Sequence, residues 1–322
     1  MRLAFFGTPD FAVPTLARLL EGPHCVVAVV SQPDRPRGRG RKQSLSPVST
    51  LALQRNLPLL RPEKVGTPAV AEELREFAPD LGVVVAFGQF LPKRIRELPA
   101  LGYLVNGHAS LLPRHRGAAP VAHAILAGDR KSGVSVMRVE REMDAGPVAL
   151  VRELAVGAGE SAGELATRLS ALSADAIAEV LERIVESTVV WSTQDDSLAS
   201  FAPKIERADA ELDFHEPAEA LVRRVRAMAP RPGAFAWHQG DALRILAARA
   251  EPGPAAGPPG RVSAGPAGLR IATAEGWLVP TVLQRAGGRP TEADAFQRGR
   301  GLPNGVRLEA RLGRAARSRL EA

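Results

Sequence analysis

The nearly continuous apolar run at 80–87 (DLGVVVAF) constrains the fold of this chain more than any other segment. A strand without polar alternation is typical of a strand buried on both faces, as in the parallel sheets of α/β proteins. Shorter apolar segments alternate with helical patterns on either side of it. The other predicted strands are 3–6, 25–31, 57–60, 101–106, 133–139 and 148–154, and the predicted helices are 10–21, 67–78, 118–127 and 161–186. This order predicts an open, Rossmann-like α/β sheet.

The pattern changes near residue 209, where one helix (216–228) is followed by short strands. These strands are predicted at 234–238, 242–249, 261–264, 268–273 and 277–284, with hairpin turns at 239–241 and 274–276. Short strands joined in this way favour a small antiparallel barrel of the oligonucleotide-binding (OB) type. A chain of 322 residues also exceeds the usual span of one core. We therefore expect an α/β catalytic domain over 1–190, a linker over 191–208 and a β-barrel domain over 209–322.

The charge of the chain favours a polyanionic partner. The sequence has 42 Lys and Arg against 35 Asp and Glu, a net charge of +7. From residue 209 onward there are 17 Arg, no Lys and 12 acidic residues, so 17 − 12 = +5 of that excess lies in the expected barrel domain. Charge of this sign and location is typical of proteins that bind nucleic acid.

Several other classes of protein are excluded by simple patterns. Cys25 is the single cysteine, so an internal disulfide is impossible, and its place at the start of an apolar run predicts a buried side chain. The spacing of His108, His115 and His123 matches no common zinc pattern, and we expect no metal. No segment reaches the ~20 apolar residues of a membrane span, and the amino-terminal MRLAFFGTPD turns polar too soon for a signal peptide. We expect a monomeric, cytoplasmic protein without membrane contact.

The turn after the first predicted strand excludes a dinucleotide site. There Thr8, Pro9 and Asp10 indicate the start of a helix, with Thr8 as its cap. A G-x-G-x-x-G motif would need three glycines, and only Gly7 is present. No G-x-x-x-x-G-K-[ST] motif occurs either, which excludes a P-loop.

Asn106, His108 and Asp144 are candidates for catalytic residues. Asn106 and His108 lie at the carboxyl end of a predicted strand, where ligands of open α/β sheets bind. Residues two apart in an extended segment project to the same side. Asp144 follows another strand, in a turn that Gly146 and Pro147 would shape. An amide, an imidazole and a carboxylate suit acyl transfer to an amine, because they can bind an oxyanion, move protons and orient the imidazole. On spacing alone, a turn-forming Asn, a surface His and a turn Asp explain the pattern equally well.

A longer resemblance favours the catalytic interpretation. The segment 106–120 (NGHASLLPRHRGAAP) resembles the signature of the folate-dependent formyltransferases. Further segments are similar to the members that act on methionyl-tRNA, in the same order along the chain: FFGTPDFAVPTLARL, VVSQPDRPRGRGRK, VVVAFGQFLP, SGVSVMRVEREMDAGPV, FAPKIERADAELDF, RAMAPRPGAFA and AFQRGRGL. The resemblance implies transfer of a formyl group from 10-formyltetrahydrofolate to the α-amino group of methionyl initiator tRNA, leaving tetrahydrofolate.

The resemblance also implies roles for individual residues. The catalytic trio falls on Asn106, His108 and Asp144. The folate-contacting residues fall on Ser110, Leu111, Leu112 and Pro113, and on Phe87, Gly88, Gln89, Phe90 and Leu91, where the backbone would hold the pterin. The loop 34–42 resembles the arm with which the family contacts tRNA, and its basic residues are Arg35, Arg37, Arg39, Arg41 and Lys42.

The sequence departs from the family signature at Gly107, Ala109 and His115, where Ile, Pro and an aromatic residue are usual. Gly107 and Ala109 would give a less rigid loop and alter the affinity for folate. Two alternatives to the main hypothesis stay open at this point. One is a sugar-amine N-formyltransferase on the same catalytic domain, and the other is a non-catalytic RNA-binding protein on the same scaffold.

Overall fold

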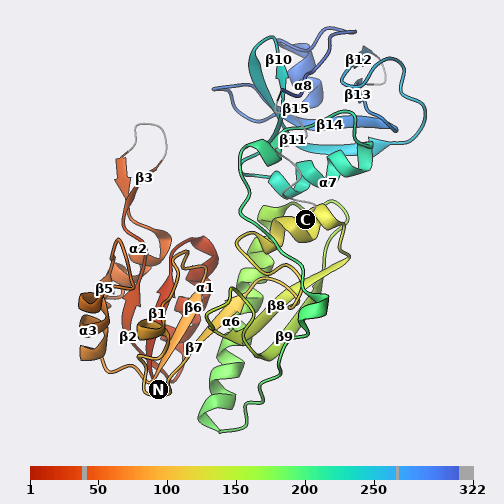
Figure 1. Cartoon of the computed structure of the whole chain (residues 1–322). Coiled ribbons are helices and arrows are strands. Elements are labelled where there is room, and N and C mark those ends of the chain that lie inside the picture. Colours follow the sequence, from red (N-terminus) through yellow and green to blue (C-terminus); the bar gives the residue numbers. More distant parts are fainter. Residues whose placement is uncertain (38–41, 266–267, 312–322) are drawn as a thin grey trace. The chain divides into compact units, whose positions relative to one another are not determined.

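The chain forms two compact units, each built around its own sheet (Figure 1). The structure, a computed structural model, describes residues 1–37, 42–265 and 268–311. One unit comprises Met1–Ala118, Lys131–Leu154 and Ala166–Phe201, and the other comprises Ala119–Arg130, Ala155–Leu165 and Ala202–Ala322. The chain thus passes between the units several times, and the domain boundaries expected from the sequence stay a prediction.

The first unit contains an open seven-stranded sheet with the order β5-β2-β1-β6-β7-β8-β9. Its strands are β1 (Arg2–Gly7), β2 (Cys25–Val30), β5 (Leu59–Leu60), β6 (Leu81–Val85), β7 (Leu104–His108), β8 (Lys131–Arg138) and β9 (Val148–Ala155). Neighbouring strands from β5 to β7 are parallel, and β8 is antiparallel to β7. Every residue of β6 is buried, as its apolar run predicts. The expected Rossmann-like α/β sheet is confirmed.

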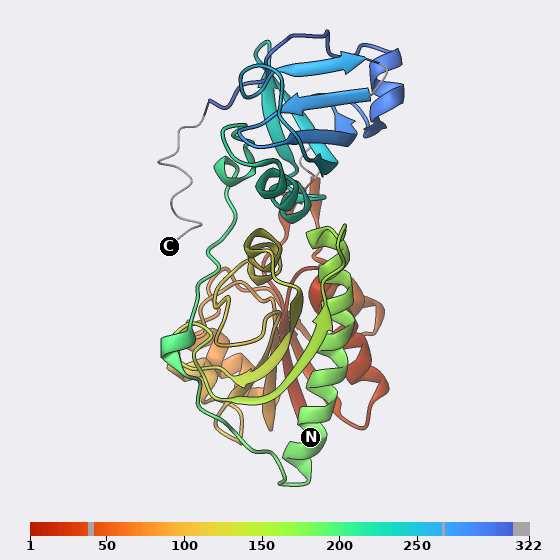
Figure 2. The same ribbon diagram turned by 90° about the vertical axis from the view of Figure 1, so that its right-hand side faces the viewer.

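Helices cover both faces of this sheet (Figures 1 and 2). They are η1 (Asp10–Ala12), α1 (Val13–Glu21), α2 (Pro47–Gln54), α3 (Pro68–Glu76), α4 (Lys93–Arg96) and the long α6 (Ala162–Val185). A capping box begins α6, since the Ser161 backbone N–H donates to Glu164 Oε2 at 2.8 Å and the Glu164 N–H donates to Ser161 Oγ at 3.3 Å. The helices α2 and α4 were not predicted.

The alternation of side chains along β7 places the candidate catalytic residues on one face. Leu104 packs in a buried cluster with Leu74 of α3 and Ile95 of α4. Gly107 faces the other way, because a Cβ atom there would lie 2.5 Å from Ser173 Oγ of α6. Successive residues of a strand point to opposite faces, so Asn106 and His108 share the face of Leu104, away from α6.

Two local predictions are wrong. Cys25 is exposed, since it is the first residue of β2 and only the later residues of that strand enter the core. Thr8 does not cap the first helix. Its hydroxyl donates to the Phe87 carbonyl at 3.0 Å and accepts from the Gln32 backbone N–H at 3.3 Å. Thr8 therefore ties the end of β1 to the segment that follows β6.

The basic arm forms a short hairpin of β3 (Arg35–Arg37) and β4 (Lys42–Ser44). Its antiparallel register pairs Arg37 with Lys42. Arg39 and Arg41 lie outside the described residues. At the base of the hairpin, Asp34 forms an ion pair with Arg61.

The carboxyl-terminal unit contains the expected antiparallel sheet, with the order β10-β11-β14-β13-β12 and β15 on β14. Its elements are α5 (Pro120–Ala127), η3 (Ala208–Ala210), α7 (Ala218–Met228), β10 (Ala234–His238), β11 (Asp241–Glu251), β12 (Val262–Gly265), β13 (Gly268–Ala272), β14 (Trp277–Gln284), β15 (Thr291–Glu292) and α8 (Ala293–Arg298). The segment 305–309 bridges the two outer strands, because Arg307 pairs with Arg261 beside β12 and Glu309 pairs with Trp237 of β10. The sheet is thereby closed toward a barrel, the OB-like form that the sequence predicts. The elements β15 and α8 were not predicted.

Gly107 provides a test of the packing of β7 on α6. In Gly107→Ala the new Cβ would lie 2.5 Å from Ser173 Oγ and 2.8 Å from Ile177 Cδ1, so we expect a loss of about 1–3 kcal/mol of stability. Ser173→Ala alone should be nearly neutral, because the Ser173 hydroxyl has no hydrogen-bond partner among the described residues. Thermal unfolding of the double variant should recover more than half of the loss. Additive losses in the double variant would contradict this packing.

Candidate active site

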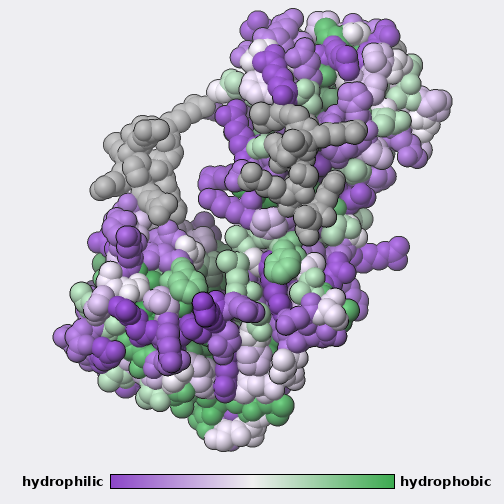
Figure 3. All heavy atoms as spheres, viewed as in Figure 1, coloured by the Kyte–Doolittle hydropathy of each residue, from purple (hydrophilic) through white to green (hydrophobic). Residues whose placement is uncertain are grey.

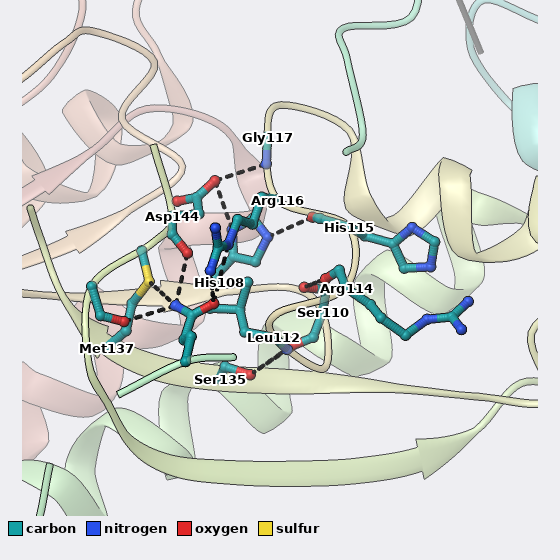
Figure 4. A network of polar contacts seen from close by, with 12 residues as sticks. His108, Ser110, Leu112, Arg114, His115, Arg116, Gly117, Ser135, Met137 and Asp144 are labelled. Carbon is teal, nitrogen blue, oxygen red and sulfur yellow. Dashed lines mark hydrogen bonds and ion pairs between the residues drawn. The ribbon is translucent and has the colours of Figure 1, made fainter. Parts of the chain in front are cut away.

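His108 and Asp144 form a partly enclosed pair in the first unit (Figure 4). His108 Nδ1 lies 3.5 Å from Asp144 Oδ2, and the two side chains are 7% and 14% exposed. His108 Nε2 lies 2.9 Å from the backbone carbonyl oxygen of His115. Both ring nitrogens of His108 are thus engaged by oxygen atoms.

These contacts determine where the imidazole carries its protons. A carbonyl oxygen only accepts hydrogen bonds, so Nε2 must bear a proton. The contact between Nδ1 and the carboxylate becomes attractive only when Nδ1 is protonated as well. Protonation of Nδ1 would turn this contact into an ion pair with Asp144.

The turn that carries Asp144 has an uncommon backbone shape. Asp144 has a left-handed φ of 52°, and its Oδ2 accepts a hydrogen bond from the Gly117 N–H at 2.8 Å. At Gly146 a Cβ atom would lie 2.0 Å from the Arg138 carbonyl oxygen, so the turn can pass there only with glycine. The expectation that Gly146 shapes this turn agrees with that close approach.

The loop after β7 is held by hydrogen bonds of its own. Ser110 is buried, and its hydroxyl donates to the Arg114 carbonyl at 2.7 Å. Ser135 of β8 donates to the Ser110 carbonyl at 2.8 Å and accepts from the Leu112 N–H at 3.1 Å. The Ser110 hydroxyl is therefore engaged within the loop, while Leu111, Leu112 and Pro113 are half-buried at its surface.

Ala109 and His115, two of the three residues that depart from the family signature, are buried. Ala109 is 8% and His115 is 7% exposed. Gly107 belongs to β7 and lies against α6, so its substitution does not loosen the loop. Ser173 and Ile177 occupy the space that a larger side chain at Gly107 would take.

The segment 86–91 exposes Ala86, Gly88 and the Phe90 side chain and buries the rest of its side chains in part or in full. Phe87 is buried, with its ring edge-on to Phe6 at 5.7 Å. Gln89 is occupied within the protein, because its amide accepts from the Val65 N–H at 2.9 Å and donates to the Pro62 carbonyl at 3.0 Å. Leu91 is buried, whereas Ala86, Gly88 and the 68% exposed Phe90 face the solvent.

Asn106 lies in β7 opposite Met137 of β8 and is half-buried. It shares the face of His108 because the two are separated by one residue of an extended strand. The structure thus brings Asn106, His108 and Asp144 into one region at the carboxyl end of β7, and the predicted folate segment 110–113 follows His108 closely in sequence.

Arg116 and Gln194 contact this site and were not predicted. Arg116 is 6% exposed and donates to Gln194 Oε1 from Nε at 3.1 Å and from Nη2 at 2.8 Å. Gln194 lies in the segment 191–208, which was predicted to be a linker. Periodicity and spacing cannot predict Gln194, because its contacts with the Asp144 turn form only in the folded chain.

Positive charge is crowded in the carboxyl-terminal unit. Burial and, after it, the charge of Arg300 lower the pKa of Arg285. Burial and then Arg285 lower the pKa of His238. Hydrophilic residues predominate on the face of this unit seen in Figure 3. The excess of Arg over acidic residues from 209 onward suits a polyanion.

No group of three or more His, Cys, Asp or Glu arranged for a metal ion occurs among the described residues. Along the same residues, none of the helices combines the length and the apolar character of a membrane-spanning segment.

Comparisons with known proteins agree with these observations along the whole chain. Residues 1–181 match the Formyl transferase family and residues 204–301 match the Formyl transferase C-terminal domain. A methionyl-tRNA formyltransferase of Thermus thermophilus is 44% identical over 309 residues, which cover 96% of this chain and 99% of the relative. One of Myxococcus xanthus is 44% identical over 305 residues, covering 94% of this chain and 96% of the relative.

Solved structures show the same fold at low sequence identity. An N-formyltransferase from Helicobacter canadensis, in complex with folinic acid and dTDP-3-aminofucose, has a TM-score of 0.65 at 16% identity, covering 89% of this chain and all (100%) of that one. A methionyl-tRNA formyltransferase from Clostridium thermocellum has a TM-score of 0.54 at 14% identity, covering 87% and 99%. The identity to the curated relatives over nearly their full length is what decides the family. The chain belongs to the formyltransferase family and, within it, to the methionyl-tRNA formyltransferases.

Proposed function

We propose that this enzyme transfers the formyl group of 10-formyltetrahydrofolate to the α-amino group of methionyl initiator tRNA, at a site formed by Asn106, His108 and Asp144. The observation that carries the proposal is the His108–Asp144 pair at 3.5 Å, with the second ring nitrogen bound to a carbonyl. This pair occurs in a chain that is 44% identical to methionyl-tRNA formyltransferases.

In the proposed reaction the methionyl amine attacks the formyl carbon directly. A C–N bond forms and the carbonyl π electrons move to oxygen. The Asn106 amide donates a hydrogen bond to this oxyanion, and the His108 imidazolium, paired with Asp144, stabilises its charge. When the intermediate collapses, the bond to folate N10 breaks, the attacking amine loses a proton and N10 gains one. Tetrahydrofolate and formyl-methionyl-tRNA are the products.

The residues around the site fit a folate. Exposed backbone at Ala86 and Gly88 offers hydrogen-bonding groups to a pterin, and the exposed Phe90 ring offers an apolar surface. Gly88 has a φ of 81°, and a Cβ atom there would lie 2.4 Å from Gln32 Nε2, so this backbone cannot be covered by a side chain. We propose Phe87, Gly88, Gln89, Phe90, Leu91 and the segment Ser110–Pro113 as the folate site, with the Gln89 and Ser110 side chains supporting the loops from within.

The proposed tRNA contacts are the hairpin at 35–44 and the basic carboxyl-terminal unit. Arg35, Arg37 and Lys42 lie on the two strands of the hairpin, and Arg39 and Arg41 lie in the sequence between them. Five cations on a short arm suit contacts to phosphates. We further propose that the enzyme works as a cytoplasmic monomer, with catalysis in the amino-terminal domain and tRNA binding shared with the carboxyl-terminal domain.

The direct test of this proposal is a comparison of three acceptors with the purified protein and 10-formyltetrahydrofolate. Methionyl initiator tRNA should be formylated, whereas methionyl elongator tRNA and a nucleotide-linked amino sugar should react far more slowly. Preference for the amino sugar would favour the sugar-amine alternative. Binding of tRNA without any transfer would favour a non-catalytic RNA-binding protein.

The catalytic roles predict separate effects on rate. His108→Ala should lower kcat by about 10²–10⁴-fold, because the proton-bearing imidazole is lost. Asn106→Ala should lower kcat by about 10²–10³-fold through the loss of an oxyanion donor. Filter binding should show unchanged affinity for the charged tRNA in both variants. A kcat within a factor of two of the wild type in either variant would contradict the assigned role.

The arm predicts a salt-dependent effect on tRNA binding alone. Replacing Arg37 and Lys42 by Ala removes two cations at paired positions of the hairpin. The slope of log affinity against log salt concentration should become shallower by roughly 1–2, while the KM for folate stays unchanged. The matched control is Lys131→Ala, which removes an exposed cation of the first unit outside the arm. An equal change in the control would contradict a specific role of the arm.

A further inference from the structure

We infer that Gln194 is a positioning residue for formyl transfer, because its amide joins the two loops that place Asp144 beside His108. This inference rests on the proposed function. Gln194 lies in the segment 191–208, which the sequence predicts to be a linker without a part in the reaction.

The nitrogen end of the Gln194 amide holds the Asp144 turn. Its Nε2 donates to the Asp144 carbonyl at 2.9 Å and to the Gly146 carbonyl at 2.7 Å. Asp144 has a left-handed φ of 52°, which is uncommon for a residue other than glycine, so contacts from outside the turn help to hold it. Two hydrogen bonds from one amide supply such a constraint on each side of Ala145.

The oxygen end of the same amide holds the loop after β7. Gln194 Oε1 accepts from Arg116 Nε and Nη2, at 3.1 and 2.8 Å. Arg116 lies between His115, whose carbonyl accepts from His108 Nε2, and Gly117, whose N–H donates to Asp144 Oδ2. The guanidinium, whose Nη2 also donates to Asp196 Oδ1 at 2.7 Å, thus belongs to the residue between the two that contact His108 and Asp144 (Figure 4).

The chemistry at this position requires a neutral amide in one orientation. Its oxygen must face the guanidinium and its NH₂ must face two carbonyls, because a reversed amide would place donors against donors and acceptors against acceptors. A glutamate would still accept from Arg116, but it would direct a carboxylate oxygen at the two carbonyls of the Asp144 turn. Gln194→Glu therefore separates the two halves of the proposed role.

A loss of Gln194 should affect the rate more than the stability. Gln194 lines an open groove together with Leu112, Pro113, Val148, Ala149, Leu150, Val151, Ser192, Thr193 and Asp195. Truncation there leaves a position that water can enter, rather than a buried cavity. Displacement of a reacting group by about 1 Å costs on the order of 10²-fold in rate, and loss of an outer partner of a site typically costs about 10–100-fold.

The experiment measures kcat and the KM values for folate and for charged tRNA in Gln194→Ala, Gln194→Glu and the control Thr193→Ala. The active fraction of each variant is determined by titration with a tight-binding folate analogue. Thr193 is the exposed neighbour of Gln194 in the same groove. We expect kcat per active site to fall by about 10–100-fold in both Gln194 variants, with both KM values within a factor of two and with Thr193→Ala equal to the wild type. A kcat within a factor of two of the wild type in Gln194→Ala or in Gln194→Glu would overturn the inference. So would a loss confined to KM, or one explained by a smaller active fraction.

A second measurement separates this inference from the proposed function. The ¹⁵N chemical shifts of the His108 ring report on its contacts whether or not the enzyme acts on tRNA. If the wild type transfers no formyl group, the proposed function fails, and an unchanged His108 spectrum in Gln194→Glu would then overturn the positioning role on its own.

Discussion

The hydrogen bond from His108 Nε2 to the His115 carbonyl is the interaction on which the rest of the site depends. At 2.9 Å it fixes the ring of His108 and requires a proton on Nε2. Nδ1 then faces Asp144 Oδ2 at 3.5 Å. The left-handed backbone of His115, with a φ of 59°, belongs to the turn that presents this carbonyl. The orientation of the His108 ring thus follows from the backbone conformation of the loop that contains His115.

The sheet and the loops supply the remaining constraints. The alternation along β7 places Asn106 and His108 on the face opposite α6, while Gly107 allows α6 to pack closely on the other side. Ser110 and Ser135 stiffen the loop that ends at Gly117. The turn between β8 and β9 places Asp144 beside His108. His108 and Asp144 are therefore each held by a backbone group, the His115 carbonyl and the Gly117 N–H.

Much of this arrangement could be predicted from the sequence. The apolar run at 81–85 and the short strands after 234 have local patterns, and the strands of both sheets other than β15 lie close to their expected positions. The pairing of Asn106 and His108 follows from the period of a strand. Their place in the site, and that of Asp144, came from a resemblance, because spacing alone could not distinguish these residues from ordinary turn residues.

Other features depend on tertiary contacts that no local pattern contains. Cys25 looked buried because the run that it begins is apolar, yet only the later residues of β2 enter the core. The sequence predicts Thr8 as a helix cap, but its hydroxyl donates to the carbonyl of Phe87, in the segment that follows β6. Gln194 lay in a polar, irregular stretch, and its role becomes visible only where that stretch meets Asp144. These differences arise where segments distant in sequence meet.

We propose that the formyl group is transferred at the face of β7 that carries Asn106 and His108. A crystal structure of the enzyme with a stable analogue of 10-formyltetrahydrofolate would show this directly. We expect the formyl oxygen within hydrogen-bond distance of the Asn106 amide, beside a His108 ring that still donates to the His115 carbonyl. A folate bound with its formyl group away from Asn106 and His108 would contradict it.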